Sequence, residues 1–441
     1  MSDEIFERMR SVVRATQKMR PVGAVAAVRG SHIEIKGLDK LARPGDRFRL
    51  IGHPARGEVI ALAVDGACGM LDEVADGIGL GDKVILEKAP RLAPHDDWIG
   101  RVIDPDGAPL DGRPLLPGMT AVGLSAAPPP PAKRRSLGHR LPTGMSVFDT
   151  LLPIVQGQRI GLFSGSGVGK STLLANLATG VQADVIVIAL VGERGREVRE
   201  FVEKTLGADG MKRSIVVAAT SDRPAQVRRR CPLAATAIAE FFRDQGKDVL
   251  LLVDSVTRLA EAHREVAVTG GEAASLRGFP PSTASMIAGL CERAGPGVER
   301  AGAITAIYTV LVAGSDMEEP VADMLRGVLD GHVVLDREIA ERGRFPAIDV
   351  PRSVSRSLPD AATEAENRLI QEARRHLAQH ARSELMIQSG LYVSGSDPRV
   401  DAAVACFEGL DEFIASPSPN GIVGAFHQLG RVLQAASHVA P

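Results

Sequence analysis

A glycine-rich segment at residues 164–172 constrains the fold of this 441-residue chain more than any other feature of its sequence. The segment reads SGSGVGKST; the apolar stretch RIGLF precedes it, and the helix-like stretch STLLANLA begins within it. In such a strand–loop–helix unit, backbone N–H groups turn toward a phosphate chain at the positive end of the helix dipole. Ser164 stands where the strict motif has glycine, but three later glycines supply the flexibility. The sequence therefore predicts a phosphate-binding loop in an α/β fold.

The residues of this loop predict the contacts of a bound ATP molecule and its Mg²⁺ ion. The residues expected to surround the nucleotide are Gly165, Ser166, Gly167, Val168, Gly169, Lys170, Ser171 and Thr172. Lys170 is expected to reach the β- and γ-phosphates, and the Ser171 hydroxyl to bind Mg²⁺. Asp254 ends the apolar stretch VLLLVD and is the second predicted magnesium ligand, directly or through water.

A glutamate after another apolar stretch predicts hydrolysis of the nucleotide rather than binding alone. Glu193 lies in GERGRE, which follows VIVIALV. A carboxylate at the carboxyl end of a strand beside the phosphate loop can polarise the attacking water. The alternative interpretation is a glutamate in an ordinary surface loop.

Changes in sequence texture divide the chain into four parts. Residues 1–21 place apolar side chains at helical spacing and predict an amphipathic helix. Residues 22–93 contain five short β-rich stretches broken by Gly, Pro and Asp, which is typical of a small β-barrel or sandwich. Residues 94–358 alternate apolar strands with helices, which predicts a parallel sheet covered on both faces, and they include a proline-rich connector at 126–135. Residues 359–441 are helical by periodicity and predict a C-terminal helical domain.

Composition and charge argue against several functions. The 52 basic and 54 acidic residues give a net charge of −2, which argues against a basic nucleic-acid-binding surface. Aromatic residues make up only 3%, which weakens any function based on stacking of bases. The four cysteines form no CxxC pair, so zinc ribbons and dithiol redox sites find no support. Without a membrane-spanning or secretory segment, we expect a cytoplasmic protein that binds no nucleic acid.

Several further motifs show a resemblance to a known family. With the loop, GERGRE, LLLVDSVTR, GFPPS, GRVIDPDGAPLDG and GSDPRVDAA resemble the catalytic subunits of rotary ATP synthases. The sequence is more similar still to the ATPases of type III protein export, and within these to the flagellar branch. The resemblance covers about residues 22–410. It implies an α/β, RecA-type P-loop ATPase core with a parallel sheet, preceded by a β-barrel and followed by a helical domain, and a Mg-dependent ATP hydrolase that assists flagellar protein export.

The resemblance also implies roles for individual residues. It assigns Glu193 to activation of water and Arg194 to the neighbourhood of the γ-phosphate. Asp254 corresponds to the aspartate that organises magnesium. Phe345, in RFPAIDV, corresponds to an aromatic residue that packs on adenine. Arg356, in SVSR, corresponds to an arginine finger that acts in a neighbouring subunit. Without the resemblance, we would interpret Phe345 as core and Arg356 as a surface ion-pair residue.

The expected partners follow from the same resemblance. It implies a homohexamer, a regulatory stator-like export protein at the N-terminus, and chaperone–substrate complexes at the C-terminal domain. It also implies a stalk protein and components of the export gate. Residues 8–20 contain five basic and no acidic residues. The helix that contains them could be a surface helix packed on its own domain, but we expect it to meet a partner or, peripherally, the inner face of the cell membrane.

Four alternatives remain open at this point. An ATPase of virulence-type secretion would share every catalytic residue, and a rotary ATP synthase subunit would work in a mixed hexamer. A hexameric RNA translocase would need aromatic residues in its barrel, but residues 21–93 contain only Phe48. A nucleotide-binding scaffold without hydrolysis is disfavoured by Glu193 and Asp254.

Overall fold

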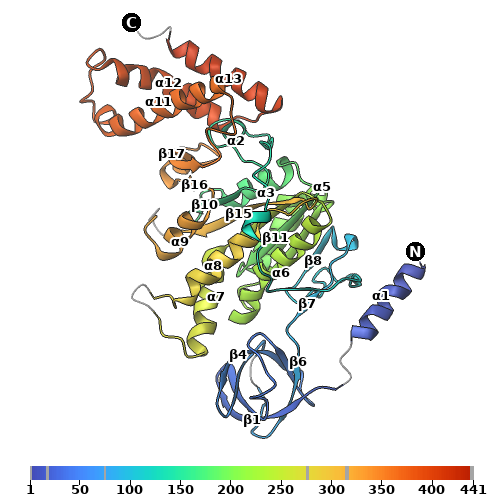
Figure 1. Ribbon diagram of the computed structural model, residues 1–441. Helices are drawn as coiled ribbons and strands as arrows, with labels where there is room; N and C mark the ends of the chain where they lie inside the picture. Colours follow the sequence, from blue (N-terminus) through green and yellow to red (C-terminus); the bar gives the residue numbers. More distant parts are fainter. Residues whose placement is uncertain (1, 16–18, 74–75, 275–277, 313–316, 438–441) are drawn as a thin grey trace.

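The computed structural model describes residues 2–15, 19–73, 76–274, 278–312 and 317–437. The chain forms a stack, with a β-barrel at one end, a mixed layer of sheet and helices in the middle and a group of helices at the other end (Figure 1). This arrangement confirms the predicted fold class.

The N-terminal helix α1 (Ser2–Ala15) stands beside the start of the core (Figure 1). Its Arg8 is buried and donates from Nη1 to Asp97 Oδ2 at 2.7 Å. The same guanidinium donates to the carbonyl groups of Leu116 and Pro117 at 2.8 and 2.9 Å. Arg8 therefore attaches α1 to the chain's own core, although the basic stretch that contains it was expected to meet a partner. Residues 1 and 16–18 of the predicted helix lie outside the described residues.

Six antiparallel strands close the barrel in the order β1-β2-β5-β4-β3-β6. They are β1 (Val22–Arg29), β2 (His32–Lys36), β3 (Arg47–Leu50), β4 (Arg56–Ala63), β5 (Gly66–Leu71) and β6 (Lys83–Glu87). Phe48 fills the interior, and Gly57 and Gly69 make room for it: a Cβ on either glycine would lie 2.3 or 2.4 Å from the Phe48 ring. The sequence predicted five strands and missed β5, whose GACGML has two glycines and no β-branched residue.

A buried ion cluster joins the barrel to the core. Glu58 of β4 accepts from Arg230 Nη1 at 2.6 Å and from Arg229 Nη2 at 2.5 Å. Both arginines belong to α6 (Ala225–Asp244), and Arg230 also contacts Asp106 at 3.3 Å. Paired charges can be buried in this way because each remains hydrogen-bonded.

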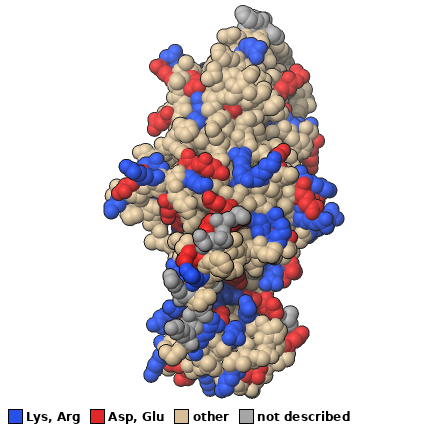
Figure 2. Space-filling view, turned by 90° about the vertical axis from the view of Figure 1, so that its right-hand side faces the viewer, with Lys and Arg blue, Asp and Glu red and all other residues tan. Residues whose placement is uncertain are grey.

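On the outer surface, Figure 2 shows acidic and basic side chains interspersed over the middle of the molecule.

The core sheet has the order β17-β16-β10-β15-β13-β11-β12-β8, with β14 paired to β15. Its strands are β8 (Arg101–Ile103), β10 (Arg159–Ser164), β11 (Val185–Val191), β12 (Ser214–Ala219), β13 (Val249–Asp254), β14 (Gly295–Pro296), β15 (Ala303–Leu311), β16 (Gly331–Leu335) and β17 (Ile348–Ser355). The pairs are parallel except that β17 runs antiparallel to β16 and β14 to β15. The strands β10, β11 and β13 therefore end at one edge of the sheet.

Helices cover both faces of this sheet, as the continuous apolar strands require. Ile186 and Ile188 of β11 pack in the same apolar cluster as α3 (Lys170–Gly180). Val185 and Val187 pack on the other face with α6, α7 (Val256–Thr269) and α8 (Ser282–Arg293). The shorter helices are α2 (Ser146–Asp149), α4 (Gly195–Glu200), α5 (Gly207–Met211), α9 (Pro320–Val328) and α10 (Arg337–Glu341). A small antiparallel pair, β7 (Arg91–Leu92) and β9 (Val122–Gly123), lies near the barrel.

Three helices form the C-terminal layer: α11 (Glu364–Gln388), α12 (Pro398–Ala415) and α13 (Gly421–Ser437). A capping box between Thr363 and Glu366 begins α11. Glu366 also accepts from Arg140 at 2.8 Å, which connects this layer to the core. Within the described part of the chain, every helix is too short or too polar to cross a lipid bilayer.

Candidate nucleotide-binding site

A cleft of about 1830 Å³ lies at the edge of the sheet where β10, β11 and β13 end. The glycine-rich loop and Glu193 line it from the core, and His380 and Phe407 line it from α11 and α12. Parallel strands carry their loops to a common edge, so residues far apart in the sequence meet there. The cleft is large enough for a nucleotide.

The glycine-rich loop connects β10 to α3. Gly167 and Gly169 have φ angles of +79° and +83°, a region that side-chain-bearing residues rarely adopt. Ser164 is fully buried at the end of β10, where its carbonyl accepts from Val312 N at 3.0 Å. The serine therefore fits at the position of the usual glycine. Its hydroxyl has no hydrogen-bond partner among the described residues.

The predicted phosphate lysine and the predicted magnesium carboxylate lie together. Lys170 Nζ forms an ion pair with Asp254 Oδ1, and Thr309 Oγ1 donates to the same oxygen at 2.7 Å. Asp254 is almost completely buried at the end of β13. Ser171 lies in the first turn of α3 and lines the same cleft. A hydroxyl and a carboxylate are the hard oxygen ligands that Mg²⁺ prefers, so these residues fit the ion.

Glu193 lies in the short loop between β11 and α4, and backbone hydrogen bonds fix this loop. Gly192 N donates to Ala219 O at 2.7 Å, and Ser221 N donates to Glu193 O at 2.9 Å. Burial, a hydrogen bond with Glu197 and the charge of Asp254 raise the pKa of Glu193 to about 7, while Lys170 opposes them. A carboxyl group with this pKa is suited to exchange protons near neutral pH.

Of the other two residues predicted for this site, Arg194 lines the cleft and Phe345 lies against the glycine-rich loop. The Arg194 side chain is 82% exposed and lies 3.4 Å from Glu197. Phe345 is half exposed, and its ring lies against the glycine-rich loop: a Cβ on Gly169 would lie 3.1 Å from Phe345 Cδ1. The structure thus brings an aromatic face next to the loop, where a base could stack on it.

Arg344 is a residue of this site that sequence reasoning missed. Its guanidinium donates to Asp411 Oδ1 of α12 at 3.0 Å, and to the carbonyl groups of Pro346 and Ile348 at 2.6 and 3.0 Å. It therefore fixes the backbone that carries Phe345 and connects it to the C-terminal layer. Its place next to Phe345 in the sequence could have indicated a role in the site, but its partner Asp411 is 67 residues away in the chain.

Val168 of the loop is buried in an apolar cluster and does not line the cleft, and Arg356 lies at a different edge of the sheet. Arg356 follows β17, and Ser355 pairs with Gly331 at the start of β16. The glycine-rich loop follows the other end of β10, which runs parallel to β16. At a rise of about 3.3 Å per residue, the six residues of β10 separate the two edges by roughly 17 Å. Arg356 is exposed there and cannot reach the loop of its own chain.

Comparisons with known proteins place this geometry in context. Residues 144–355 match the family model described as "ATP synthase alpha/beta family, nucleotide-binding domain". Residues 362–417 match the family model described as "T3SS EscN ATPase C-terminal domain". The flagellum-specific ATP synthase of Caulobacter vibrioides is 41% identical, over 97% of this chain and 99% of that protein. The type 3 secretion system ATPase of Xanthomonas euvesicatoria is 40% identical, over 94% and 91%.

Solved structures agree with these relatives. The assembled ATPase EscN of the type III secretion system of enteropathogenic E. coli matches with a TM-score of 0.86 and 39% identity, over 93% of this chain and 100% of that chain. EscN in complex with its central stalk EscO matches with a TM-score of 0.83 over the same shares.

Proposed function

The chain belongs to the family of flagellum-specific ATP synthases and type 3 secretion ATPases, and we propose that a second copy of the chain completes its ATP-hydrolysing site. It is an ATPase, and flagellar protein export is the first candidate for the process that it serves. The observation that carries the proposal is the position of Arg356 at the sheet edge opposite the glycine-rich loop. A homohexameric ring would place each Arg356 beside the loop of the next subunit.

Within one site, the cleft residues divide the work of phosphoryl transfer. Lys170 and the loop backbone bind the phosphates, and Ser171 and Asp254 would hold Mg²⁺, whose charge would offset that of the phosphates. Glu193 accepts a proton from the attacking water, and Arg194 lies near the γ-phosphate. Phe345 packs on adenine. Arg356 of the neighbouring subunit stabilises the charge that develops during transfer.

The surroundings of the ring are proposed by analogy with the family. ATP hydrolysis releases and unfolds chaperone-bound export substrates at the C-terminal layer, close to a stalk protein and the export gate. The N-terminal helix binds a regulatory stator-like protein. The assembly lies in the cytoplasm against the inner face of the cell membrane and binds no nucleic acid. EscN in complex with its central stalk EscO supports the stalk partner.

An ATPase of virulence-type secretion is the second candidate. It is favoured by the 40% identity to the Xanthomonas ATPase, which nearly equals the 41% to the Caulobacter protein. Flagellin export distinguishes the two candidates. Deletion of the gene should abolish swarming, and the chain should restore it, whereas the Lys170→Ala variant should not.

The assembled site predicts that ATP turnover depends on protein concentration. The specific activity of the purified chain is expected to rise with concentration together with ring formation, because a lone protomer lacks the finger. Turnover and sedimentation measured on the same dilution series test this. Lys170→Ala should lower turnover about 10²–10³-fold at every concentration, because a donor to the transferred phosphate is lost. A specific activity that stays constant from dispersed protomers to rings would contradict the proposal.

Glu193 gives the reaction a measurable pH dependence. With a pKa raised to about 7, its carboxyl group is mostly protonated below that pH and mostly ionised above it. Only the ionised form accepts a proton, so kcat/KM is expected to rise through neutral pH and then level off. Glu197→Gln removes a hydrogen bond and a charge that raise this pKa, so the inflection should move to lower pH. Glu203→Gln, an exposed neighbour paired with Arg199, is the control. If the inflection of kcat/KM against pH stays in place in Glu197→Gln, it does not report the ionisation of Glu193.

A further inference from the structure

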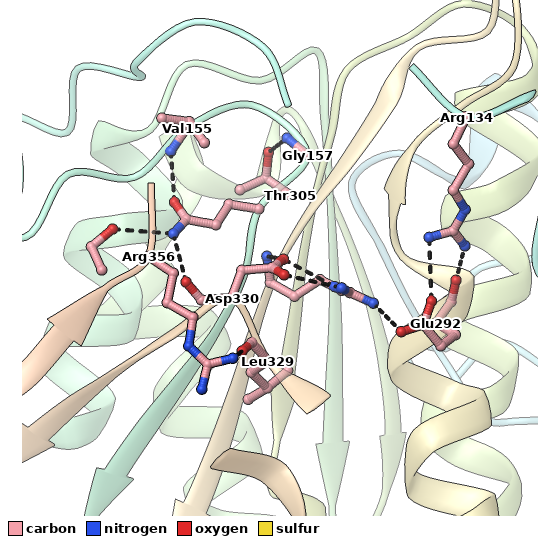
Figure 3. A network of polar contacts seen from close by, with 11 residues as sticks. Arg134, Val155, Gly157, Glu292, Thr305, Leu329, Asp330 and Arg356 are labelled. Carbon is pink, nitrogen blue, oxygen red and sulfur yellow. Dashed lines mark hydrogen bonds and ion pairs between the residues drawn. The ribbon is translucent and has the colours of Figure 1, made fainter. Parts of the chain in front are cut away.

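Carbonyl groups at the end of a short helix hold the Arg356 side chain. Nη1 donates to Leu329 O at 3.1 Å, as Figure 3 shows, and Nη2 donates to Arg326 O at 3.2 Å. These carbonyls belong to the last turn of α9 and the residue after it. A guanidinium there meets the negative end of the helix dipole and carbonyls that lack helical partners. The direction of this exposed side chain therefore depends on the position of the turn after α9.

Asp330 fixes that turn. Its carbonyl accepts from Arg356 N at 3.0 Å. Its carboxylate accepts three hydrogen bonds of 3.0 Å from Arg159, from the backbone N and Nε to Oδ2 and from Nη2 to Oδ1. Asp330 N donates in return to Arg159 O at 2.8 Å. A two-pronged arginine–carboxylate pair sets orientation as well as distance.

A buried glutamine fixes the same turn from inside the core. Gln158 is fully buried and donates from Nε2 to Asp330 O at 3.2 Å and to Ser355 Oγ at 3.1 Å. Its Oε1 accepts from Val155 N at 2.9 Å (Figure 3). Because Ser355 directly precedes Arg356, the backbone is fixed on both sides of the turn.

A second carboxylate prevents Arg159 from turning away. Arg159 Nη1 donates to Glu292 Oε1 at 2.6 Å. Glu292 of α8 is contacted in turn by Arg134, whose Nη1 lies 3.4 Å from Oε2 and whose Nη2 donates to the Glu292 carbonyl. Figure 3 shows this chain of contacts running from Arg134 through Glu292 toward Asp330 and Arg356.

We propose that Asp330, clamped by Arg159, is a positioning residue for Arg356, so that each subunit presents a pre-oriented arginine to the neighbouring site. The inference rests on the proposed action of Arg356 in a neighbouring subunit. Pre-orientation matters because a displacement of about 1 Å in a catalytic group can lower a rate about 10²-fold. Neither Asp330 nor Arg159 touches the cleft of its own chain.

Mixed rings test the inference directly. Asp330→Asn alone should lower kcat about 10–100-fold and leave the KM for ATP unchanged, because the loop of the same chain is intact. In an equal mixture with Lys170→Ala, it should recover activity, since Lys170→Ala subunits supply a well-placed finger to intact loops. In an equal mixture with Arg356→Ala, it should not recover, because every finger is then defective. Arg159→Lys, which keeps the charge but loses the fork, should behave in the same way.

The opposite pattern would overturn the inference. If Asp330 served only the fold of its own site, Asp330→Asn would recover with Arg356→Ala and not with Lys170→Ala. A kcat equal to wild type would overturn it as well. Should Arg356→Ala and Lys170→Ala fail to complement each other, the proposed function fails and not only the positioning role.

A matched control separates positioning from general stability. Arg101 and Asp111 form another two-pronged pair, at 2.6 and 2.7 Å, beside β8 at the far end of the sheet order. Asp111→Asn removes a comparable ion pair with no link to Arg356. It is expected to keep the kcat of wild type in assembled rings even where the melting temperature falls.

Discussion

Arg356→Ala is expected to lower the kcat for ATP hydrolysis about 10³–10⁵-fold, the range by which arginine fingers accelerate phosphoryl transfer. The side chain lies at the sheet edge opposite its own glycine-rich loop, so the loss reflects the site of the neighbouring subunit. Nucleotide binding should persist, because Lys170, Ser171 and Asp254 are untouched. Steady-state turnover and titration with a fluorescent ATP analogue measure the two effects.

The matched control for this variant is Arg352→Ala. Arg352 lies on β17, four residues before Arg356, and pairs at 3.3 Å with Asp336, which lines the cleft as Arg352 does. We expect Arg352→Ala to lower kcat much less than Arg356→Ala does. A wild-type kcat in assembled Arg356→Ala rings would show that the arginine takes no part in the reaction.

Glu193→Gln is expected to lower kcat about 10²–10⁴-fold, the usual contribution of a general base, while Mg-ATP still binds. Glutamine keeps the size and hydrogen-bonding capacity of the side chain but cannot accept the proton of the attacking water. The rate of single-turnover hydrolysis should therefore fall in this variant, whereas its Kd for ATP should stay that of the wild type.

Glu197→Gln is the control for this variant, because Glu197 lies next to Glu193 in the cleft and is not proposed to accept the proton. It should shift the pH profile and keep the maximal rate. Loss of ATP binding in Glu193→Gln would instead assign this glutamate to binding.

Local patterns predicted the parts of the fold that depend on short segments. The loop at residues 164–172 and the strand that ends at Asp254 could be predicted because the pattern that defines each consists of adjacent residues. Strand β5 was missed because Gly69 makes room for the Phe48 ring and Gly66 for the backbone of β2, and both demands come from other strands. Arg8 appeared to belong to a docking surface, whereas its partner Asp97 is 89 residues away and only folding brings them together.

The contrast between local patterns and contacts of distant residues also explains which parts of the site the sequence could predict. Lys170, Glu193 and Asp254 could be placed at one edge because parallel strands end together. The separation of Arg356 from them depends on the antiparallel return of β17, which no local pattern reveals. The pairs Arg344–Asp411 and Arg159–Asp330 span 67 and 171 residues, so their contribution was visible only in the structure. The assigned roles of the site residues remain predictions.

The most direct test of the shared site is the turnover of an equal mixture of Arg356→Ala and Lys170→Ala subunits reassembled into rings. With random mixing, about one quarter of the interfaces in a closed ring pair an intact loop with an intact finger. The account predicts that the mixture recovers up to about that share of wild-type activity, far above either variant alone. Verified mixed rings whose activity equals only the average of the two variants would contradict it.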